Sequence, residues 1–404
     1  MNTKHLWAPL TALALTALLA TTARAAPPTE IVLWHSYRAG ERAALEKVVA
    51  AFNDGRDDIR IATLAVPYDA FADKITAAIP RGKGPDLFIF AQDRIGDWAA
   101  SEVIEPIDFW VTEEMQDAFL PPTLEAMTYD DAIYGLPVAF KMIALIYNKA
   151  LVKEPPATTE EMIAVGQRLA KSEGMFGLAY ENANFWYHGA WMQGFGGRVF
   201  DRRGGPTLDS KSVLDSLHFA QKLAHRSGIM PEEISGTLVT TLFNRGQVGM
   251  VINGPWFLGE IDDDVDYGVA PLPVISENGQ APRPFLTAEG IIMSARAEDK
   301  KAAFEVMTYL TGVAAGKIMA KEGRQTPARK AVYQDPAIGK DPILSVFKAQ
   351  LERSIPTPNT PAMCMVWTPA TTMMNKVING KMAPEAAAAP AQADVVELVK
   401  GARR

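Results

Sequence analysis

The chain has 404 residues, of which 48% are apolar and 22% charged, so it can bury sizeable cores and is longer than one typical domain. Its formal charge of −7 falls to −9 if Lys4 and Arg24 leave with an N-terminal leader. This acidic balance argues against nucleic acid and anionic membrane surfaces as partners. Cys364 is the only cysteine, so no internal disulfide can form.

The first 25 residues have the order of a secretory signal peptide. Lys4 and His5 precede an apolar run over 8–20, and small residues follow at Ala23 and Ala25. The run is shorter than the roughly 20 residues that a membrane-spanning helix needs. No cysteine stands at the cleavage site to take a lipid. We therefore expect a signal peptide over 1–25 and a periplasmic protein without a lipid anchor.

Strand and helix patterns alternate through the first hundred residues. A strand "EIVLWH" precedes a helix "GERAALEKVVAAF", which Gly55 ends, and "IRIATLAV" precedes "YDAFADKITAAI" in the same way. The motif "GPDLFIFAQDR" then supplies the strand 87–90. Such alternation predicts an α/β domain with a largely parallel sheet.

The pattern changes near residue 133, where the apolar runs 133–138 and 143–147 indicate a crossover between lobes. The segment 150–245 is mainly helical. Strand signals return at 248–252, in "DYGVAPLP" and in "FLTAEGIIMS", before the helix "EDKKAAFEVMTYL". Near the C-terminus, Pro384 and Pro390 interrupt an Ala-rich stretch, which predicts a bend before a final helix.

Three strands end in polar or aromatic side chains. The sequences at these ends are "WHSYR", "AQDR" and "NGPW". Ligands of open α/β sheets lie beyond the carboxyl ends of strands. A sugar needs this mixture of groups, because its ring faces are apolar and its edge carries hydroxyls that donate and accept hydrogen bonds. The strand ends therefore predict a sugar site.

Each candidate also has a structural interpretation. Trp256 is either a stacking platform, with Gly254 allowing a close turn and Pro255 fixing it, or a core residue. The Asp93–Arg94 pair either binds hydroxyls or begins the following helix as an N-cap. Trp186 and Trp367 have the same two alternatives, because each either faces a cleft or belongs to the core.

Catalytic and metal-binding patterns are absent from the sequence, so we expect no cofactor and no metal. The 5 histidines form no metal-ligand spacing, and no nucleophile motif is present. Asp93, Glu181 and Glu289 all lie near expected strand ends, which leaves open a glycosidase that uses paired carboxylates.

Four motifs together resemble the periplasmic maltose/maltodextrin-binding proteins, the sugar-binding subunits of ABC importers. They are "GPDLFIFAQDRIGDWA", "YGLPVAFKMIALIYNK", "FNRGQVGMVINGPW" with "DYGVAPLP", and "MCMVWTPATTMMNKVINGK". The resemblance runs from about Ile31 to the C-terminus. It implies a two-lobed α/β periplasmic-binding-protein fold with a hinge and an interlobe cleft. The expected lobes are 26–138 plus 288–335, and 139–287 plus 336–404.

The resemblance also implies the site residues. Asp93 and Arg94 match the family's hydroxyl-binding pair, and Trp256 and Trp367 match its stacking tryptophans. Phe90 stands where these binders often have a tryptophan, and Trp186 where they have a tyrosine.

Two positions depart from the family pattern, because Lys141 and Asn184 replace glutamates. The hydrogen-bonding pattern of the pocket therefore differs from that of maltose binders. Ser36, Tyr37 and Arg38 complete the expected set, from the first loop.

We expect a monomeric binding protein, not an enzyme, that captures maltodextrin-type oligosaccharides and delivers them to the membrane permease of an ABC importer. One alternative is another sugar, such as trehalose or a charged sugar that pairs with Lys141. A secreted glycoside hydrolase is the second alternative.

Overall fold

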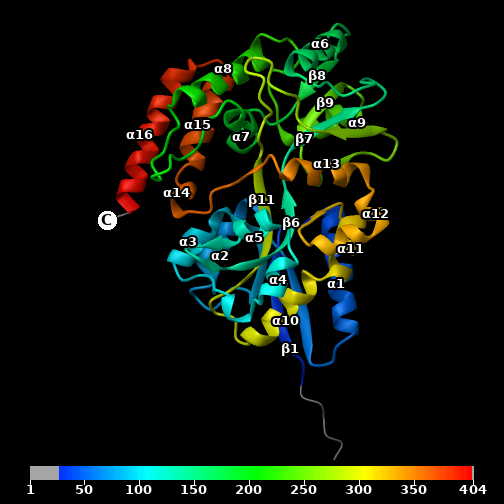
Figure 1. The fold of residues 1–404 in the computed structure, drawn as a ribbon, viewed down its shortest axis with the longest axis vertical. Helices are drawn as coiled ribbons and strands as arrows, with labels where there is room; N and C mark the ends of the chain where they lie inside the picture. The colour runs from blue at the N-terminus through cyan, green and yellow to red at the C-terminus, as the bar shows by residue number, and fades with distance from the viewer. Residues whose placement is uncertain (1–26, 403–404) are drawn as a thin grey trace, which may run out of the picture.

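The computed structural model describes residues 27–402, so the expected signal peptide lies outside the described residues. Two sheets, one above the other, organise a two-lobed molecule (Figure 1). We call the two halves the large-sheet lobe and the small-sheet lobe. The predicted two-lobed α/β fold is confirmed. Among the described residues, no helix combines the length and the apolar character that a membrane crossing requires.

The large sheet has the strand order β12-β6-β11-β3-β1-β2, and β13 pairs with β11. Its strands are β1 (Thr29–His35), β2 (Ile59–Ala65), β3 (Leu87–Ala91), β6 (Gly135–Lys141), β11 (Phe285–Met293), β12 (Thr326–Pro327) and β13 (Ile355–Pro356). The small hairpin β4 (Thr128–Tyr129) and β5 (Ala132–Ile133) lies beside it.

The expectation of a largely parallel sheet is right for only part of the large sheet. Strand β1 pairs in parallel with β2 and β3, but β11 is antiparallel to both β3 and β6. The reason is chain direction. Strand β6 runs toward the small-sheet lobe, which the chain enters after Met142 and Ile143. Strand β11 runs back from that lobe, so it is antiparallel to β6.

Helices and short 3-10 turns surround the large sheet. They are α1 (Ala39–Asp54), α2 (Tyr68–Ala78), η1 (Gln92–Arg94), α3 (Ile95–Ala100), η2 (Asp108–Trp110), α4 (Glu113–Asp117), α5 (Pro121–Ala126), α10 (Lys300–Leu310), α11 (Val313–Lys321), η4 (Lys330–Gln334) and α12 (Pro336–Gly339). Buried side chains on both faces of the sheet form two cores, with Leu33 in one and Phe88 in the other.

The small sheet has the order β10-β7-β9-β8. Its strands are β7 (Ala144–Asn148), β8 (Phe176–Ala179), β9 (Val248–Asn253) and β10 (Tyr267–Ala270). The elements around it are α6 (Thr159–Leu169), α7 (Phe185–Gly194), α8 (Lys211–His225), α9 (Gly236–Asn244), η3 (Pro255–Glu260), α13 (Pro342–Leu351), α15 (Trp367–Ile378) and α16 (Pro384–Ala402). Helix α14 (Pro361–Cys364) lies against η1 and α3 of the large-sheet lobe.

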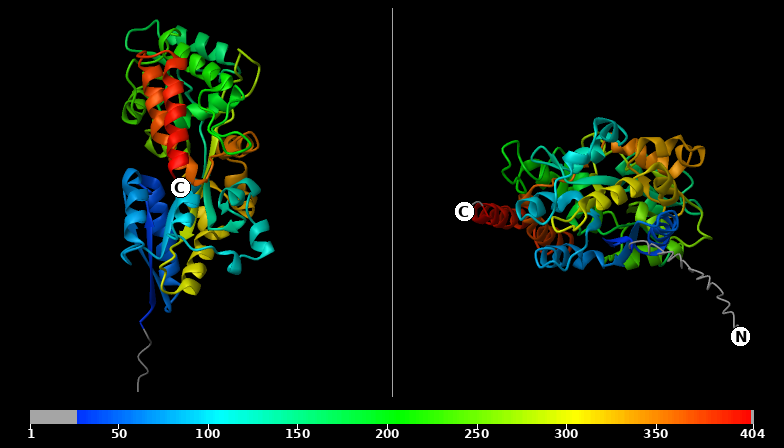
Figure 2. Two further views of the ribbon diagram at one scale, coloured as in Figure 1. Left: turned by 90° about the vertical axis from the view of Figure 1, so that its left-hand side faces the viewer. Right: turned by 90° about the horizontal axis from the view of Figure 1, so that it is seen from below.

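The chain crosses between the lobes along β6, along β11 and through the segment after α13 (Figures 1 and 2). The expected lobe boundaries at 138 and 287 fall inside β6 and β11. These two strands pair over most of their length, and we call this pair the ribbon. Strand β12 pairs with β6 and β13 pairs with β11 on its two sides. Residues near its upper end can contact both lobes.

The predicted bend near the C-terminus is wrong. Helix α16 is continuous from Pro384 to Ala402, with Pro390 inside it. Proline removes a helix hydrogen bond, but Ala387, Ala388 and Val395 are buried in one core with side chains of α15. Figure 2 shows the two helices side by side along the small-sheet lobe. This packing keeps the helix continuous.

Candidate functional site

Strand β9 ends at Asn253, and the 3-10 helix η3 that follows it carries Trp256. The Asn253 Oδ1 atom accepts hydrogen bonds from the Gly254 N–H at 2.9 Å and from the Tyr187 hydroxyl at 3.1 Å. Gly254 has an extended backbone with φ of −106°, which any residue can adopt. A Cβ atom there would lie 2.0 Å from Cζ3 of Trp256. Gly254 thus provides space for the folded-back indole, whereas we expected it to permit a tight turn.

Trp186 meets Trp256 at the junction of the lobes. Their ring centroids are 5.7 Å apart with an interplanar angle of 57°. The Trp186 Nε1–H donates to Thr287 Oγ1 at 3.2 Å, which ties helix α7 to the ribbon strand β11. Both indoles are half-buried. We call this pair the aromatic corner.

Asn184 is the N-cap of α7, because its Oδ1 accepts the Trp186 backbone N–H at 3.0 Å. The side chain is exposed and lines a cavity of about 260 Å³. Glu181, Thr371 and Asn375 also line this cavity. The side-chain oxygen of Asn184 therefore caps α7, and the residue also lines the cavity.

The structure brings Asp93 and Arg94 close to Trp367, which comes from the C-terminal segment. Burial raises the pKa of Asp93 to about 6, and the Arg94 charge and the Trp367 indole only partly oppose this. The backbone N–H of Gly96 donates to Asn359 O at 2.9 Å, which holds the C-terminal segment over η1 and α3. The N-cap alternative for Asp93 is wrong, since Arg94 occupies the N-cap of α3.

Phe90 is covered and presents no open ring face. It is only 4% exposed and lies between Phe71, at 4.8 Å, and Tyr68, at 5.0 Å between ring centroids. Tyr68, the first residue of α2, is 55% exposed and forms the outer ring of this stack. Sequence reasoning missed Tyr68. The signal was available, because Tyr68 follows the carboxyl end of β2 and the same strand-end rule applies to it.

Lys141 lies inside an ion cluster. Its Nζ is 2.9 Å from Glu41 Oε1 and 3.0 Å from Glu289 Oε1, and it lies 5.5 Å from the centroid of the Tyr37 ring. Burial works against the charge on Lys141, but Glu289 and Glu41 outweigh it and raise its pKa. Burial and the same carboxylates raise the pKa of Tyr37, so its phenol is neutral.

The other two residues of the first loop do not join this cluster. Ser36 is half-buried. Arg38 is 74% exposed, and its Nη2 lies 3.1 Å from Glu260 Oε1 of η3, on the other lobe. The structure therefore gathers seven of the predicted residues in three groups: Trp186 with Trp256, Asp93 with Arg94 and Trp367, and Lys141 with Tyr37. Phe90, Asn184, Ser36 and Arg38 lie outside these groups.

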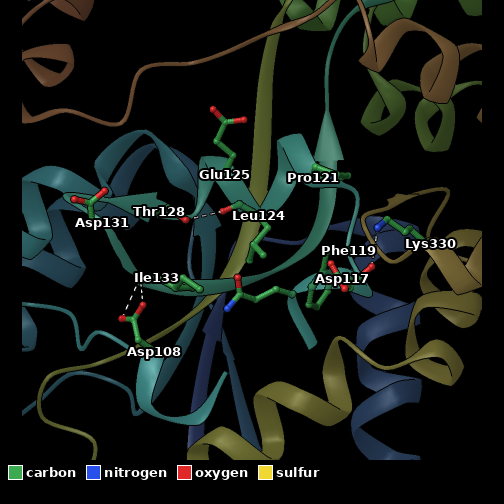
Figure 3. Close-up of a pocket in the computed structure, with 11 residues that line it drawn as sticks. Asp108, Asp117, Phe119, Pro121, Leu124, Glu125, Thr128, Asp131, Ile133 and Lys330 are labelled. Carbon is green, nitrogen blue, oxygen red and sulfur yellow. Dashed lines mark hydrogen bonds between the residues drawn. The ribbon is translucent and has the colours of Figure 1, made fainter. Parts of the chain in front are cut away.

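A larger cavity of about 470 Å³ lies elsewhere in the large-sheet lobe (Figure 3). Asp108, Glu125 and Asp131 line it, together with Lys330, whose Nζ donates to Asp117 O at 2.7 Å. None of the predicted site residues lines this cavity.

Comparison with known proteins relates the chain to solute-binding proteins. A family described as bacterial extracellular solute-binding protein matches residues 36–317. The maltotriose-binding protein of Pyrococcus abyssi is 31% identical over 344 residues, covering 84% of this chain and 75% of that protein. The galactooligosaccharide-binding protein of Bacillus subtilis is 27% identical over 373 residues, covering 89% and 87%.

A solved structure resembles most of the chain. The Thermus thermophilus maltotriose binding protein, bound with maltotriose, is 26% identical with a TM-score of 0.84. The match covers 91% of this chain and 100% of that one.

Proposed function

We propose that this chain, which belongs to the family of bacterial extracellular solute-binding proteins, captures oligosaccharides of the maltose and maltodextrin type. The observation that supports the proposal is that Trp186 and Trp256 pack together against β11 at the junction of the lobes, while Trp367 lies beside Asp93 and Arg94. The relatives named for maltotriose support the choice of sugar.

The chemistry of the site suits a sugar. In the proposal, Trp256, Trp186 and Trp367 cover apolar ring faces, and Asp93 and Arg94 bind hydroxyls at the edge. Tyr68 adds an outer aromatic surface above Phe90. The remaining proposed contacts are Asn184, Lys141, Ser36, Tyr37 and Arg38. Of these, Asn184 also caps α7, and Lys141 is paired with Glu41 and Glu289.

Binding would close the two lobes over the ligand. We propose the lobes 26–138 plus 288–335 and 139–287 plus 336–404, with β6 and β11 as the hinge. Helix α12 and strand β13 fall inside the last range but lie in the large-sheet lobe. Ligand drives closure only through a difference in affinity between the open and closed forms. Turning a 1:99 population into 99:1 needs about 5.5 kcal/mol, which several stacking and charge-assisted contacts can supply.

The same proposal covers location and partners. The mature protein would act in the periplasm as a monomer, without nucleic acid. Its closed form would dock on a membrane permease, whose ATPase partners supply the energy. The chain itself would not be an enzyme. In support, Glu289, one of the carboxylates considered for catalysis, is held by Lys141 at 3.0 Å.

Equilibrium dialysis with maltotriose, trehalose and a galactooligosaccharide tests the proposal, with product analysis of each dialysate after prolonged incubation. We expect maltotriose to be retained and recovered intact. Shortened products would refute the binding-protein proposal. Retention of trehalose or the galactooligosaccharide in place of maltotriose would keep the transport role and overturn the choice of sugar.

A further inference from the structure

The cluster formed by Glu41, Lys141 and Glu289 is a charged group inside the large-sheet lobe. The Lys141 Nζ atom contacts one oxygen of each carboxylate, and the three side chains are 14%, 14% and 7% exposed in the order Lys141, Glu41, Glu289. Two carboxylates against one ammonium leave the cluster with no free positive charge. Such an arrangement is costly to bury unless it has further partners.

The cluster adjoins the aromatic corner. Lys141 lies directly opposite Thr287 in the β6–β11 ladder. Residues that face each other in an antiparallel pair share one face of the sheet, with Cβ atoms about 5 Å apart. Thr287 Oγ1 accepts the indole N–H of Trp186. A ligand resting on the aromatic corner therefore lies beside Lys141 and its two carboxylates.

Hydrogen bonds inside the cluster are incomplete. An ammonium has three donors, and Lys141 directs two of them to Glu41 and Glu289. Glu41 Oε1 also accepts from Gln325 Nε2 at 3.4 Å. Within residues 27–402, the buried atoms Tyr37 Oη, Glu289 Oε2 and Gln325 Oε1 have no hydrogen-bond partner. A hydroxyl, which donates and accepts at once, matches the remaining donor of Lys141 and the partly exposed carboxylate of Glu41.

We propose that Glu41, Lys141 and Glu289 determine the specificity of the sugar site by binding a hydroxyl of a neutral sugar and excluding sugars that carry a carboxylate. The inference rests on the proposed function. The ammonium of Lys141 is already balanced by two carboxylates, so a sugar carboxylate would add a third negative charge without a counter-ion. Like charges this close are strongly unfavourable at a poorly solvated site.

Calorimetric titration with two trisaccharides tests this inference. One is maltotriose, and the other is the same chain with its non-reducing-end CH₂OH oxidised to a carboxylate. The variants are Glu41→Gln and Glu289→Gln, which keep side-chain size. Glu277→Gln is the control, because Glu277 pairs with Lys222 at 2.7 Å on the surface of the small-sheet lobe.

We expect the wild-type protein to bind maltotriose at least about tenfold more tightly than the acidic trisaccharide, the scale of one hydrogen bond to a charged group. Glu41→Gln should weaken maltotriose binding by about tenfold. The ratio of the affinities for maltotriose and for the acidic trisaccharide should fall by a similar factor, because the variant lacks one of the two negative charges that balance Lys141. Glu289→Gln should narrow the same preference. Glu277→Gln should change neither quantity.

Equal wild-type affinity for both trisaccharides would overturn the inference. The inference would also be overturned if Glu41→Gln and Glu289→Gln kept the wild-type ratio of affinities for the two trisaccharides while circular dichroism showed that both variants are folded. If the wild-type protein and Glu277→Gln bind no maltotriose, the proposed function fails and the inference fails with it. The maltotriose titrations of these two proteins therefore separate the two failures.

Discussion

The guanidinium of Arg38 lies 3.1 Å from the carboxylate of Glu260, and this ion pair joins the two lobes. Arg38 precedes α1 in the large-sheet lobe, and Glu260 is the last residue of η3, the short helix that carries Trp256. The pair therefore links the first loop directly to the element that positions the proposed sugar platform.

The exposed position of Arg38 sets the expected size of its contribution. Surface ion pairs contribute about 0–1 kcal/mol, so Arg38→Gln should weaken maltotriose binding by no more than a few-fold. The wild-type affinity should fall as ionic strength rises, and the variant should lose this dependence. Arg42→Gln is the control, because Arg42 pairs with Glu46 inside α1. Titration calorimetry at low and high salt measures both effects. A hundredfold loss would show that Arg38 acts otherwise than through this ion pair.

Gly254 tests the position of the Trp256 ring. A methyl group at Gly254 would meet the indole at 2.0 Å, so Gly254→Ala should push the ring out of the aromatic corner. We expect maltotriose affinity to fall at least tenfold, within the range for loss of an aromatic anchor, about 2 kcal/mol or more. The protein should stay folded, because its backbone is extended there. Gly259→Ala adds the same methyl group to open space and should bind normally. Unchanged affinity in Gly254→Ala would contradict the proposed role of the ring.

The raised pKa of Asp93 predicts opposite pH effects on stability and on binding. Burial raises the pKa to about 6, from an ordinary value near 4. The folded state therefore gains stability from Asp93 below about pH 4 and loses it as pH rises through about 6. Sugar hydroxyls that donate to Asp93 favour its charged form, so maltotriose affinity should weaken as pH falls below about 6.

Titration calorimetry from pH 5 to pH 8 measures this dependence. Asp93→Asn should flatten it, because the neutral side chain has no proton to release. A variant that keeps the wild-type slope would show that another group is responsible.

Asn184 gives a prediction about stability. Its side chain caps α7, and replacing such a cap by alanine lowers the free energy of unfolding by about 1 kcal/mol. Asn184→Ala should show this loss in urea denaturation, whereas Asn184→Asp should keep most of the stability. Asn375→Ala is a suitable control, because Asn375 lines the same cavity but caps no helix. Equal stability of Asn184→Ala and the wild-type protein would contradict the capping role.

Local signals predicted much of the fold from sequence. Gly55 ends α1, and the strands expected over 87–90 and 248–252 form as β3 and β9. Each of these outcomes depends on neighbours within a few residues. The continuity of α16 through Pro390 could not be predicted in this way, because it depends on packing against α15.

The site was less predictable for the same reason. Lys141 was expected to contact a ligand, but Glu41 and Glu289, both distant in sequence, hold it in an ion cluster. Phe90 was expected as a platform, yet Tyr68 covers it. A strand end shows where side chains emerge, whereas the partners that they meet depend on the whole fold.

The central claim is that Trp256 forms the platform of a maltodextrin site, and calorimetric titration of the mature protein with maltotriose tests it most directly. The measurement is repeated with Trp256→Ala, with thermal unfolding to check that both proteins are folded. We predict that the wild-type protein binds maltotriose and that the variant loses at least about thirtyfold in affinity, equivalent to about 2 kcal/mol. Wild-type affinity in the folded variant would contradict the account.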